Sequence, residues 1–256
     1  QHTSHLPIFF IFAVSNIGGC LLPIGDPPLF LGYLKGVPFF WTINLWLEWL
    51  AAICLLLIVF FLWDTLAYRK ETAYSLRRDD LDYQPLKLKG GINILLLLGV
   101  LLAVIFITPD NLQAWRLDHG PWVFLREYIM LLLAVSSLLT SPLSSETRRE
   151  NNFTFAPILE VAYLFIGIFI TMIPALAILK LHGAELGINQ PWQFFWASGS
   201  LSAVLDNAPT YLTFLSLAQG LVNTQPTLYP VSADLAGVGV PAALLAAISL
   251  GSVFMG

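Results

Sequence analysis

The sequence predicts an all-α polytopic membrane protein, on the basis of its composition, its long apolar runs and the clustering of its charges. Hydrophobic residues make up 57% of the 256 residues and charged residues 11%, compared with about 25% in soluble domains. The mean hydropathy of +0.76 is likewise far above the soluble range. We therefore expect a chain that is embedded in a lipid bilayer.

Long uncharged runs divide the chain into candidate membrane spans. A helix needs about 20 predominantly apolar residues to cross the hydrocarbon of a bilayer. Residues 45–67 form one such span, with Glu48 and Asp64 near its ends. Further runs near or above this length cover residues 92–109, 128–145, 161–179, 186–205, 207–233 and 235–256.

The distribution of Lys and Arg predicts how these spans are oriented. The segment 68–91 carries six basic residues, and the loop that contains Arg148 and Arg149 lies on the same predicted side. The opposite side carries Lys35, Arg116 and Lys180. Because cytoplasmic loops are enriched in Lys and Arg, we expect residues 68–91 to be a cytoplasmic loop. The spans then run inward at 45–67, outward at 92–108, inward at 123–140 and outward at 156–179.

One apolar stretch contains residues that a plain membrane helix would not need. In "SNIGGCLLPIGDPPLFLGYL", residues 15–34, the candidates are Ser15, Asn16, Gly18, Gly19 and Asp26. Ser, Asn and paired Gly are poor helix formers, and a broken helix in lipid is tolerated only where it faces protein or a water-filled cavity. Two prolines after Asp26 favour a new helix start. The stretch is read as helix, break and helix, although Asp26 could also cap a helix at the membrane surface.

A second stretch repeats this pattern late in the chain. "SGSLSAVLDNAPTYLTFLSLAQG", residues 198–220, places Asp206, Asn207, Pro209 and Thr210 inside another apolar segment. Aligning Asp26 on Asn207 pairs a proline with Pro209. We expect residues 16–19 and 206–209 to be non-helical and to approach each other. As simple spans the two stretches would run antiparallel, which is the inverted-repeat arrangement of secondary transporters; as re-entrant hairpins, they would leave the direction open.

Besides Asp26, two carboxylates in apolar surroundings are candidates for the ion path. A charged side chain at the bilayer centre costs roughly 2.5 to 3.5 kcal/mol on insertion scales, so an intramembrane Asp is a functional candidate. Asp206 lies between two long uncharged runs, with a helix cap as the alternative role. Glu160 lies one turn into its span, where Thr171 and Pro174 suggest a second weak point in the helix. An interfacial or ion-paired role for Glu160 stands beside a place in a proton path.

The GDPP of the first stretch and the LDNAPT of the second resemble the ion-transporter superfamily. The resemblance is closest to its sodium/proton antiporter branch and to the neighbouring citrate-transport group, and "GPWVFLREYIM" and "PILEVAYLFIGIFITMIPAL" extend it over most of the chain. It implies a scaffold bundle, a transport bundle with inverted repeats and broken helices or re-entrant hairpins, a homodimer, and elevator-like alternating access. The residues that match its binding motifs are Ser15, Asn16, Gly18, Gly19, Asp26, Asp206, Asn207, Pro209 and Thr210.

The same resemblance suggests how the chain is divided. Residues 1–67 would form the first transport-bundle segment and one span, 68–91 the loop, 92–185 the scaffold-like and linking spans, and 186–256 the second transport-bundle segment with a partial repeat. Because such proteins continue on both sides of these motifs, we expect a piece of a longer protein. It would lie in a bacterial inner (cytoplasmic) membrane.

The chemistry of these residues leaves three function classes. Na⁺ prefers oxygen ligands, and Asp206, Asn207, Thr210 and Asn16 supply them, which favours sodium/proton antiport. A carrier of citrate or another small organic anion would use the same fold but would need helix N-termini or a cation at its substrate, and Arg126 is the only arginine within a predicted span. A membrane scaffold without transport is the third class. No enzyme motif is present, and neither a cofactor nor a nucleic-acid partner is expected beyond the bilayer and transported Na⁺, H⁺ or anion.

The predicted topology can be tested with a cysteine at Ser75, in the middle of the loop 68–91. In intact cells, an impermeant thiol reagent should fail to label Ser75→Cys, because the loop is cytoplasmic. Permeabilised cells should label fully. Efficient labelling of intact cells would invert the topology.

Overall fold

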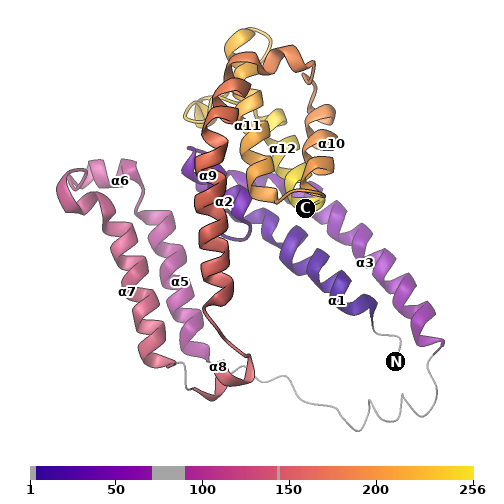
Figure 1. The fold of residues 1–256 in the computed structure, drawn as a ribbon, viewed down its shortest axis with the longest axis vertical. Coiled ribbons are helices and arrows are strands. Elements are labelled where there is room, and N and C mark those ends of the chain that lie inside the picture. Colours follow the sequence, from indigo (N-terminus) through magenta and orange to yellow (C-terminus); the bar gives the residue numbers. More distant parts are fainter. Residues whose placement is uncertain (1–3, 71–89, 143–144) are drawn as a thin grey trace. The chain divides into compact units, whose positions relative to one another are not determined.

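The computed structural model describes residues 4–70, 90–142 and 145–256, and every regular element among these residues is a helix. This confirms the predicted all-α class. The chain divides into two compact units (Figure 1): the first contains residues 1–81 and 163–256, and the second contains residues 82–162. Most of the predicted loop 68–91 lies outside the described residues.

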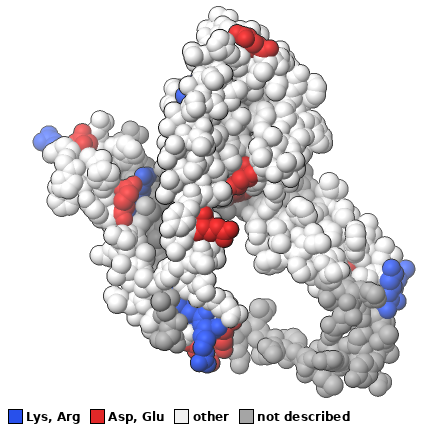
Figure 2. Space-filling model, viewed as in Figure 1, with Lys and Arg blue, Asp and Glu red and all other residues white. Residues whose placement is uncertain are grey.

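Several helices have the length and composition of membrane spans. Three helical stretches are long and apolar enough to cross a bilayer: Phe39–Tyr68, Gly120–Thr140 and Ala156–Leu186. Shorter apolar stretches cover His5–Leu21, Gly91–Phe106 and Ala242–Phe254. Figure 2 shows charged side chains as small separate patches on an otherwise uncharged surface. The chain is therefore a polytopic membrane protein.

The N-terminal part of the first unit is a chain of short helices that ends in one long helix. α1 (His5–Phe10) continues into the π-helical η1 (Ile11–Asn16) and the 3-10-helical η2 (Ile17–Leu21). After a non-helical segment, the chain forms α2 (Pro27–Leu34), η3 (Phe39–Leu45) and α3 (Trp46–Tyr68). Gly36 has φ +103° directly after α2, a conformation that requires glycine.

The C-terminal part of the first unit contains shorter helices than the uncharged runs predict. Its elements are the end of α9 (Ala156–His182), η5 (Gly183–Leu186), α10 (Pro191–Ser202), α11 (Asn207–Thr224), η6 (Ala233–Leu235) and α12 (Ala242–Phe254). The runs 186–205, 207–233 and 235–256 are therefore not single full-length spans. Between α11 and α12, Pro230, Gly239 (φ +71°) and Pro241 interrupt the helix, because proline removes a donor and Gly239 adopts a left-handed turn.

α9 passes through Pro174 without a break. The hydroxyl of Thr171 donates to the carbonyl of Gly167 one turn earlier, at 2.9 Å. The weak point predicted around Thr171 and Pro174 is therefore not a helix break. A proline within a helix removes one hydrogen bond, but a long helix can keep its course through such a point.

The second unit is built around a pair of helices, α5 (Gly91–Phe106) and α7 (Leu125–Thr140). α6 (Pro109–Ala114), η4 (Gly120–Phe124), α8 (Glu146–Glu150) and the first turns of α9 complete it. Asn93 of α5 accepts a hydrogen bond from the Ser137 hydroxyl of α7 at 2.9 Å. Arg126 pairs with its neighbour Glu127 at 2.8 Å, so that arginine is already engaged by a carboxylate.

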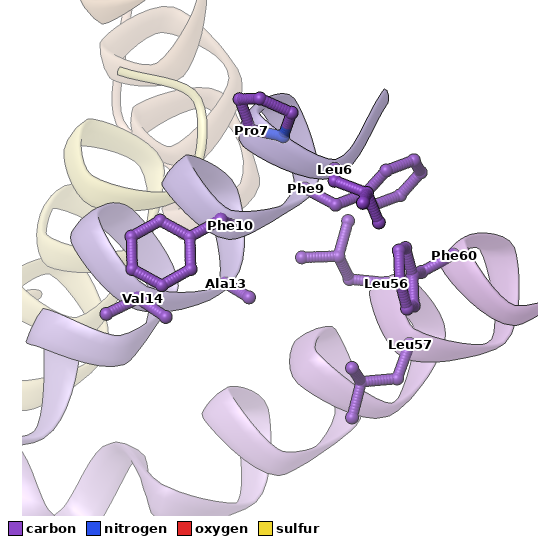
Figure 3. A pocket seen from close by; sticks show the side chains of 9 residues that line it. All are labelled: Leu6, Pro7, Phe9, Phe10, Ala13, Val14, Leu56, Leu57 and Phe60. Carbon is purple, nitrogen blue, oxygen red and sulfur yellow. The ribbon is translucent and has the colours of Figure 1, made fainter. Parts of the chain in front are cut away.

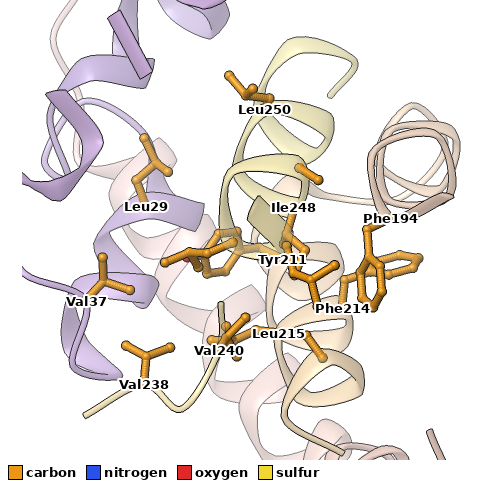
Figure 4. Close-up of a cluster of buried hydrophobic side chains, with 14 of the residues drawn as sticks. Leu29, Val37, Phe194, Tyr211, Phe214, Leu215, Val238, Val240, Ile248 and Leu250 are labelled. Carbon is orange, nitrogen blue, oxygen red and sulfur yellow. The ribbon is translucent and has the colours of Figure 1, made fainter. Parts of the chain in front are cut away.

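The core of the first unit lies where α2, α11 and α12 meet. Tyr211, Leu215 and Ile248 are buried there, and Leu29 reaches the same cluster from α2 (Figure 4). Between α10 and α12 the contact is made by small residues: Ser198, Gly199, Gly251 and Ser252. Small side chains let helix backbones approach closely, which is how helices commonly associate in membranes.

Gly220 of α11 tests this packing. A Cβ atom there would lie 2.6 Å from the Leu179 carbonyl oxygen and 2.8 Å from that of Lys180, both backbone atoms that cannot move aside alone. We expect Gly220→Ala to lower the free energy of unfolding by about 1 to 3 kcal/mol, as overpacking does. The measurement is thermal unfolding of the purified protein.

Gly167→Ala in α9 is the matched control. Nothing lies within 4 Å of a Cβ at Gly167, and alanine has the higher helix propensity, so this variant should be as stable as the wild type or slightly more so. Equal melting temperatures for the two variants would contradict the close approach at Gly220.

Candidate functional site

The first helix break lies between η2 and α2, at residues 22–26. Leu22 and Asp26 are both extended, and each precedes a proline, which disfavours the helical conformation of the residue before it. Asn16 and Gly19 remain helical, because the chain only tightens there from a π-helix to a 3-10 helix. The prediction of a non-helical segment at 16–19 is therefore wrong, and the break follows about one turn later.

The break folds back on itself through a close approach of two glycines. A Cβ at Gly19 would lie 2.6 Å from the Gly25 carbonyl oxygen. The amide of Gly25 donates to Leu22 at 2.9 Å, which closes the turn. The freed carbonyl of Leu21 accepts a hydrogen bond from the hydroxyl of Thr42 at 2.9 Å. Backbone groups at the break are thus partly satisfied by protein, as a broken helix in a membrane requires.

The second break lies between α10 and α11, at residues 203–206. Asp206 is extended (φ −64°, ψ 143°), and α11 begins at Asn207. Asn207 and Pro209 are therefore in the first helical turn, and only Asp206 of the predicted segment 206–209 is non-helical. Asp26 and Asp206 both occupy the position that precedes a helix, so the structural register pairs these two residues and differs by one from the alignment on Asn207.

The two aspartates differ in exposure and share the lack of a capping bond. Asp26 is 5% exposed, and its Oδ2 is buried without a hydrogen-bond partner among the described residues. Asp206 is exposed. Neither side chain accepts a hydrogen bond from the first turn of its helix, so neither acts as a helix cap.

A polar cluster surrounds the second break and reaches the first. The Ser202 hydroxyl lies 2.9 Å from Asn207 Oδ1 and 2.7 Å from the Ser252 carbonyl oxygen. The buried Thr210 hydroxyl donates to the Asp206 carbonyl at 3.0 Å. Asn16 donates through Nδ2 to the carbonyl of Gly256, which lies beside Asn207. Of the residues predicted from the sequence, Asn16, Asp206, Asn207 and Thr210 therefore belong to one cluster in the first unit, and Asp26 lies at the first break.

Other predicted residues lie at the edge of this cluster or outside it. Ser15 and Gly18 are exposed on η1 and η2. Pro209 is half-buried in the first turn of α11, and its carbonyl accepts a bond from Thr213. Glu160 is exposed in the part of α9 that belongs to the second unit. No group of three or more His, Cys, Asp or Glu side chains able to hold a metal ion occurs in the described part of the chain.

Three residues of the site were not predicted from the sequence. Thr42 donates to the Leu21 carbonyl, and the Ser252 carbonyl accepts a hydrogen bond from the Ser202 hydroxyl. Gly25 permits the fold-back of the first break. A signal existed for Ser252, because a serine beside Gly251 in an apolar helix marks a close helix contact. Thr42 carries no such signal, since its partner is decided by tertiary packing.

The arrangement offers oxygen ligands and little positive charge. Carboxylate, hydroxyl, amide and carbonyl oxygens suit a hard cation or a proton. No described Lys or Arg belongs to the two breaks. Both helix N-termini carry a favourable dipole for an anion, but Pro27, Pro28 and Pro209 remove several of the N–H donors that would bind it.

Comparison with known protein families decides the class of protein. A family described as "Putative citrate transport" matches residues 1–256, the whole chain. The chain belongs to this family. It is accordingly a membrane transport protein. Neither a curated protein nor a solved structure matches the chain.

Thr42→Val tests how the first break is supported. Valine keeps the shape of the side chain but leaves the Leu21 carbonyl without its donor, and an unsatisfied buried group costs about 1 to 3 kcal/mol. We expect a lower melting temperature and faster backbone hydrogen exchange at residues 19–25.

Thr65→Val provides the comparison, because the Thr65 hydroxyl only donates to the Phe61 carbonyl of its own helix. This variant should unfold like the wild type. If both variants behave alike, the Thr42 hydrogen bond does not support the break.

Proposed function

We propose that the chain carries out cation-coupled secondary transport of citrate or a chemically similar carboxylate, with the cation at the two helix breaks. The observation that carries the proposal is that the two breaks meet beside Gly256, which contacts both Asn16 and Asn207. Asp26 and Asp206 each lie directly before a helix start, and each lacks a capping bond. The family match supports the anion, and the oxygen-rich breaks support the cation.

Electrostatics gives a physical reason for coupling. The two breaks each carry a carboxylate, and that of Asp26 is buried without a hydrogen-bond partner, so a bound Na⁺ or a proton would neutralise uncompensated negative charge. A citrate anion would add further negative charge beside them, with no described Lys or Arg in the breaks to offset it. Substrate binding is therefore favourable only after a cation or proton has neutralised the site. This order of binding produces cotransport.

Sodium/proton antiport is the second candidate, because of the buried and unpartnered Oδ2 of Asp26. Burial favours the protonated form of a carboxyl group, and an arriving Na⁺ favours the charged form. The same group could therefore release H⁺ as Na⁺ binds. In the antiport scheme Asp26 exchanges the proton, while Asp206, Asn16, Asn207 and Thr210 add oxygen ligands for Na⁺. Ser15, Gly18 and Gly19 lie in the helical turns that precede the first break.

The wider architecture follows the same proposal. The two broken segments would be inverted repeats of a transport bundle, moving in an elevator-like manner in a homodimer. The protein would lie in a bacterial inner membrane with residues 68–91 in the cytoplasm. Because the prolines leave few free N–H groups, the helix N-termini alone would bind the anion weakly.

Transport by the full-length protein in sealed vesicles distinguishes the candidates. Labelled citrate and an internal pH dye are followed together while Na⁺, Li⁺ or K⁺ is added outside. We expect citrate uptake that depends on a Na⁺ or H⁺ gradient. Proton movement driven by Na⁺ without citrate would favour antiport. Neither flux in vesicles that contain folded protein would contradict both candidates.

Replacement of the aspartates tests their role in the same assay. Asp206→Asn and Asp26→Asn keep the size of the side chain but remove the charge that holds the cation. We expect cation-driven flux to fall roughly tenfold to a hundredfold, since interactions with a charged group contribute about 1.5 to 3 kcal/mol. Asp206→Glu should keep weak activity with an altered cation affinity.

Asp234→Asn is the matched control, because Asp234 is exposed in η6, away from both breaks. It should transport like the wild type. Normal cation-driven flux by folded Asp26→Asn and Asp206→Asn would remove both residues from the mechanism.

A further inference from the structure

An apolar groove runs between the N-terminal helix and α3. Leu6, Phe9 and Ala13 line one side, and Leu56, Leu57 and Phe60 line the other (Figure 3). The groove has a volume of about 470 Å³, within the range of pockets that hold small molecules. We call it the α1–α3 groove. Its partly exposed walls include Leu6 and Leu57, so it opens at the surface of the first unit.

A second hollow lies between the same two helices and has a polar character. Ser4 and His5 line it from the N-terminal side, and Trp63, Ala67 and Lys70 line it from α3. His5 is buried, and its Nε2 lies 3.0 Å from Asp64 Oδ1, so that carboxylate is already engaged. Lys70 is exposed at the end of α3 beside Arg69. Lys70 is therefore the cationic side chain that lines this hollow.

The two hollows lie in line along one face of α3. Leu56, Phe60, Trp63, Ala67 and Lys70 follow one another at intervals of three or four residues, which places them on the same helix face. The rings of His5 and Phe60 lie 6.0 Å apart, and those of Phe9 and Phe60 5.2 Å apart, so the aromatic cluster connects the levels of the two hollows.

The dimensions match one leaflet of a bilayer. From Leu56 to Lys70 the helix rises about 21 Å at 1.5 Å per residue. Half of a bilayer, including its headgroup region, is about 20 to 22 Å thick. Along α3 an apolar section is followed by aromatic residues and then by a basic residue at the end of the helix. A phospholipid in the same leaflet has its parts in the same order, with acyl chains at depth and the phosphate at the surface.

We propose that the α1–α3 groove and the hollow at Lys70 together hold one anionic phospholipid. An acyl chain would lie against Ala13, Leu56 and Phe60, and the phosphate would lie near Lys70 and Ser4. The positive end of the groove favours an anionic lipid over another apolar helix, which would leave Lys70 without a complement. A single resident lipid would also join α1 to α3 beside the first broken segment.

Photo-crosslinking tests the site in the full-length protein. The protein is placed in phosphatidylcholine vesicles that contain a trace of phosphatidylglycerol with a photoreactive group in the middle of one acyl chain. We expect adducts to concentrate on peptides that contain residues 6–14 and 56–60. The same probe with a phosphatidylcholine headgroup should label these peptides less.

Two variants separate the acyl and headgroup parts of the site. Ala13→Trp fills the groove and should abolish the concentrated labelling, whereas Ala51→Trp on an exposed part of α3 outside the groove should not. Lys70→Gln should weaken phosphatidylglycerol binding about fivefold, because a basic residue at an anionic membrane surface contributes about 1 kcal/mol. Lys180→Gln, an equal loss of charge on α9, should leave it unchanged.

The outcomes decide the occupant. Labelling that follows surface exposure along α3, or that is equal for the two headgroups, would reduce the groove to ordinary lipid contact and overturn the proposal. A photoreactive residue at position 13 gives a further test. Crosslinks from it to a protein segment other than α3, or to a second copy of the chain, would also overturn the proposal. Unchanged labelling in folded Ala13→Trp would have the same consequence.

Discussion

The structure depends on one constraint, which is that a helix in lipid cannot end without other protein groups to satisfy its backbone. The two breaks of the first unit meet this condition in different ways. At the first break the Thr42 hydroxyl, from η3, bonds to the Leu21 carbonyl. At the second, the Thr210 hydroxyl of the next helix turn bonds to the Asp206 carbonyl, and the Ser202 hydroxyl ties α10 to the Ser252 carbonyl of α12. Without the packing of α2, α11 and α12, these polar groups would be exposed to hydrocarbon at a cost of several kcal/mol each.

The same packing gives the two aspartates their unequal surroundings. Asp26 is enclosed between the fold-back of the first break and its own helix, whereas Asp206 is exposed at the end of a turn. Because one carboxylate is buried and the other is exposed, the two differ in how readily each holds a cation or a proton. Under the proposed function, positive charge for an anionic substrate would come from the bound cation, because the breaks contain no described basic residue. This dependence links the proposed cation site to citrate transport.

At the first break, the structure differs from the prediction made from the sequence. Asn16 and the glycine pair were expected to interrupt the helix because they are poor helix formers, but they only tighten it. The interruption occurs at Leu22 and Asp26, where a following proline acts sterically on the residue before it. Helix propensity is a weak preference of at most about 1 kcal/mol per residue, apart from proline. A steric exclusion is the stronger signal.

The sequence by itself determined the membrane class, the all-helical fold and the presence of a helix break beside each of Asp26 and Asp206. Apolar composition and proline sterics act locally, so they can be recognised without knowledge of the fold. Tertiary structure alone decided which groups link the two breaks, that Asp26 is the buried carboxylate, and that Thr42 supports the first break. These features depend on which helices pack together. Contacts between residues distant in the chain leave no local pattern. An apolar helix face can pack against several different partners, because a core accepts many hydrophobic side chains of similar volume.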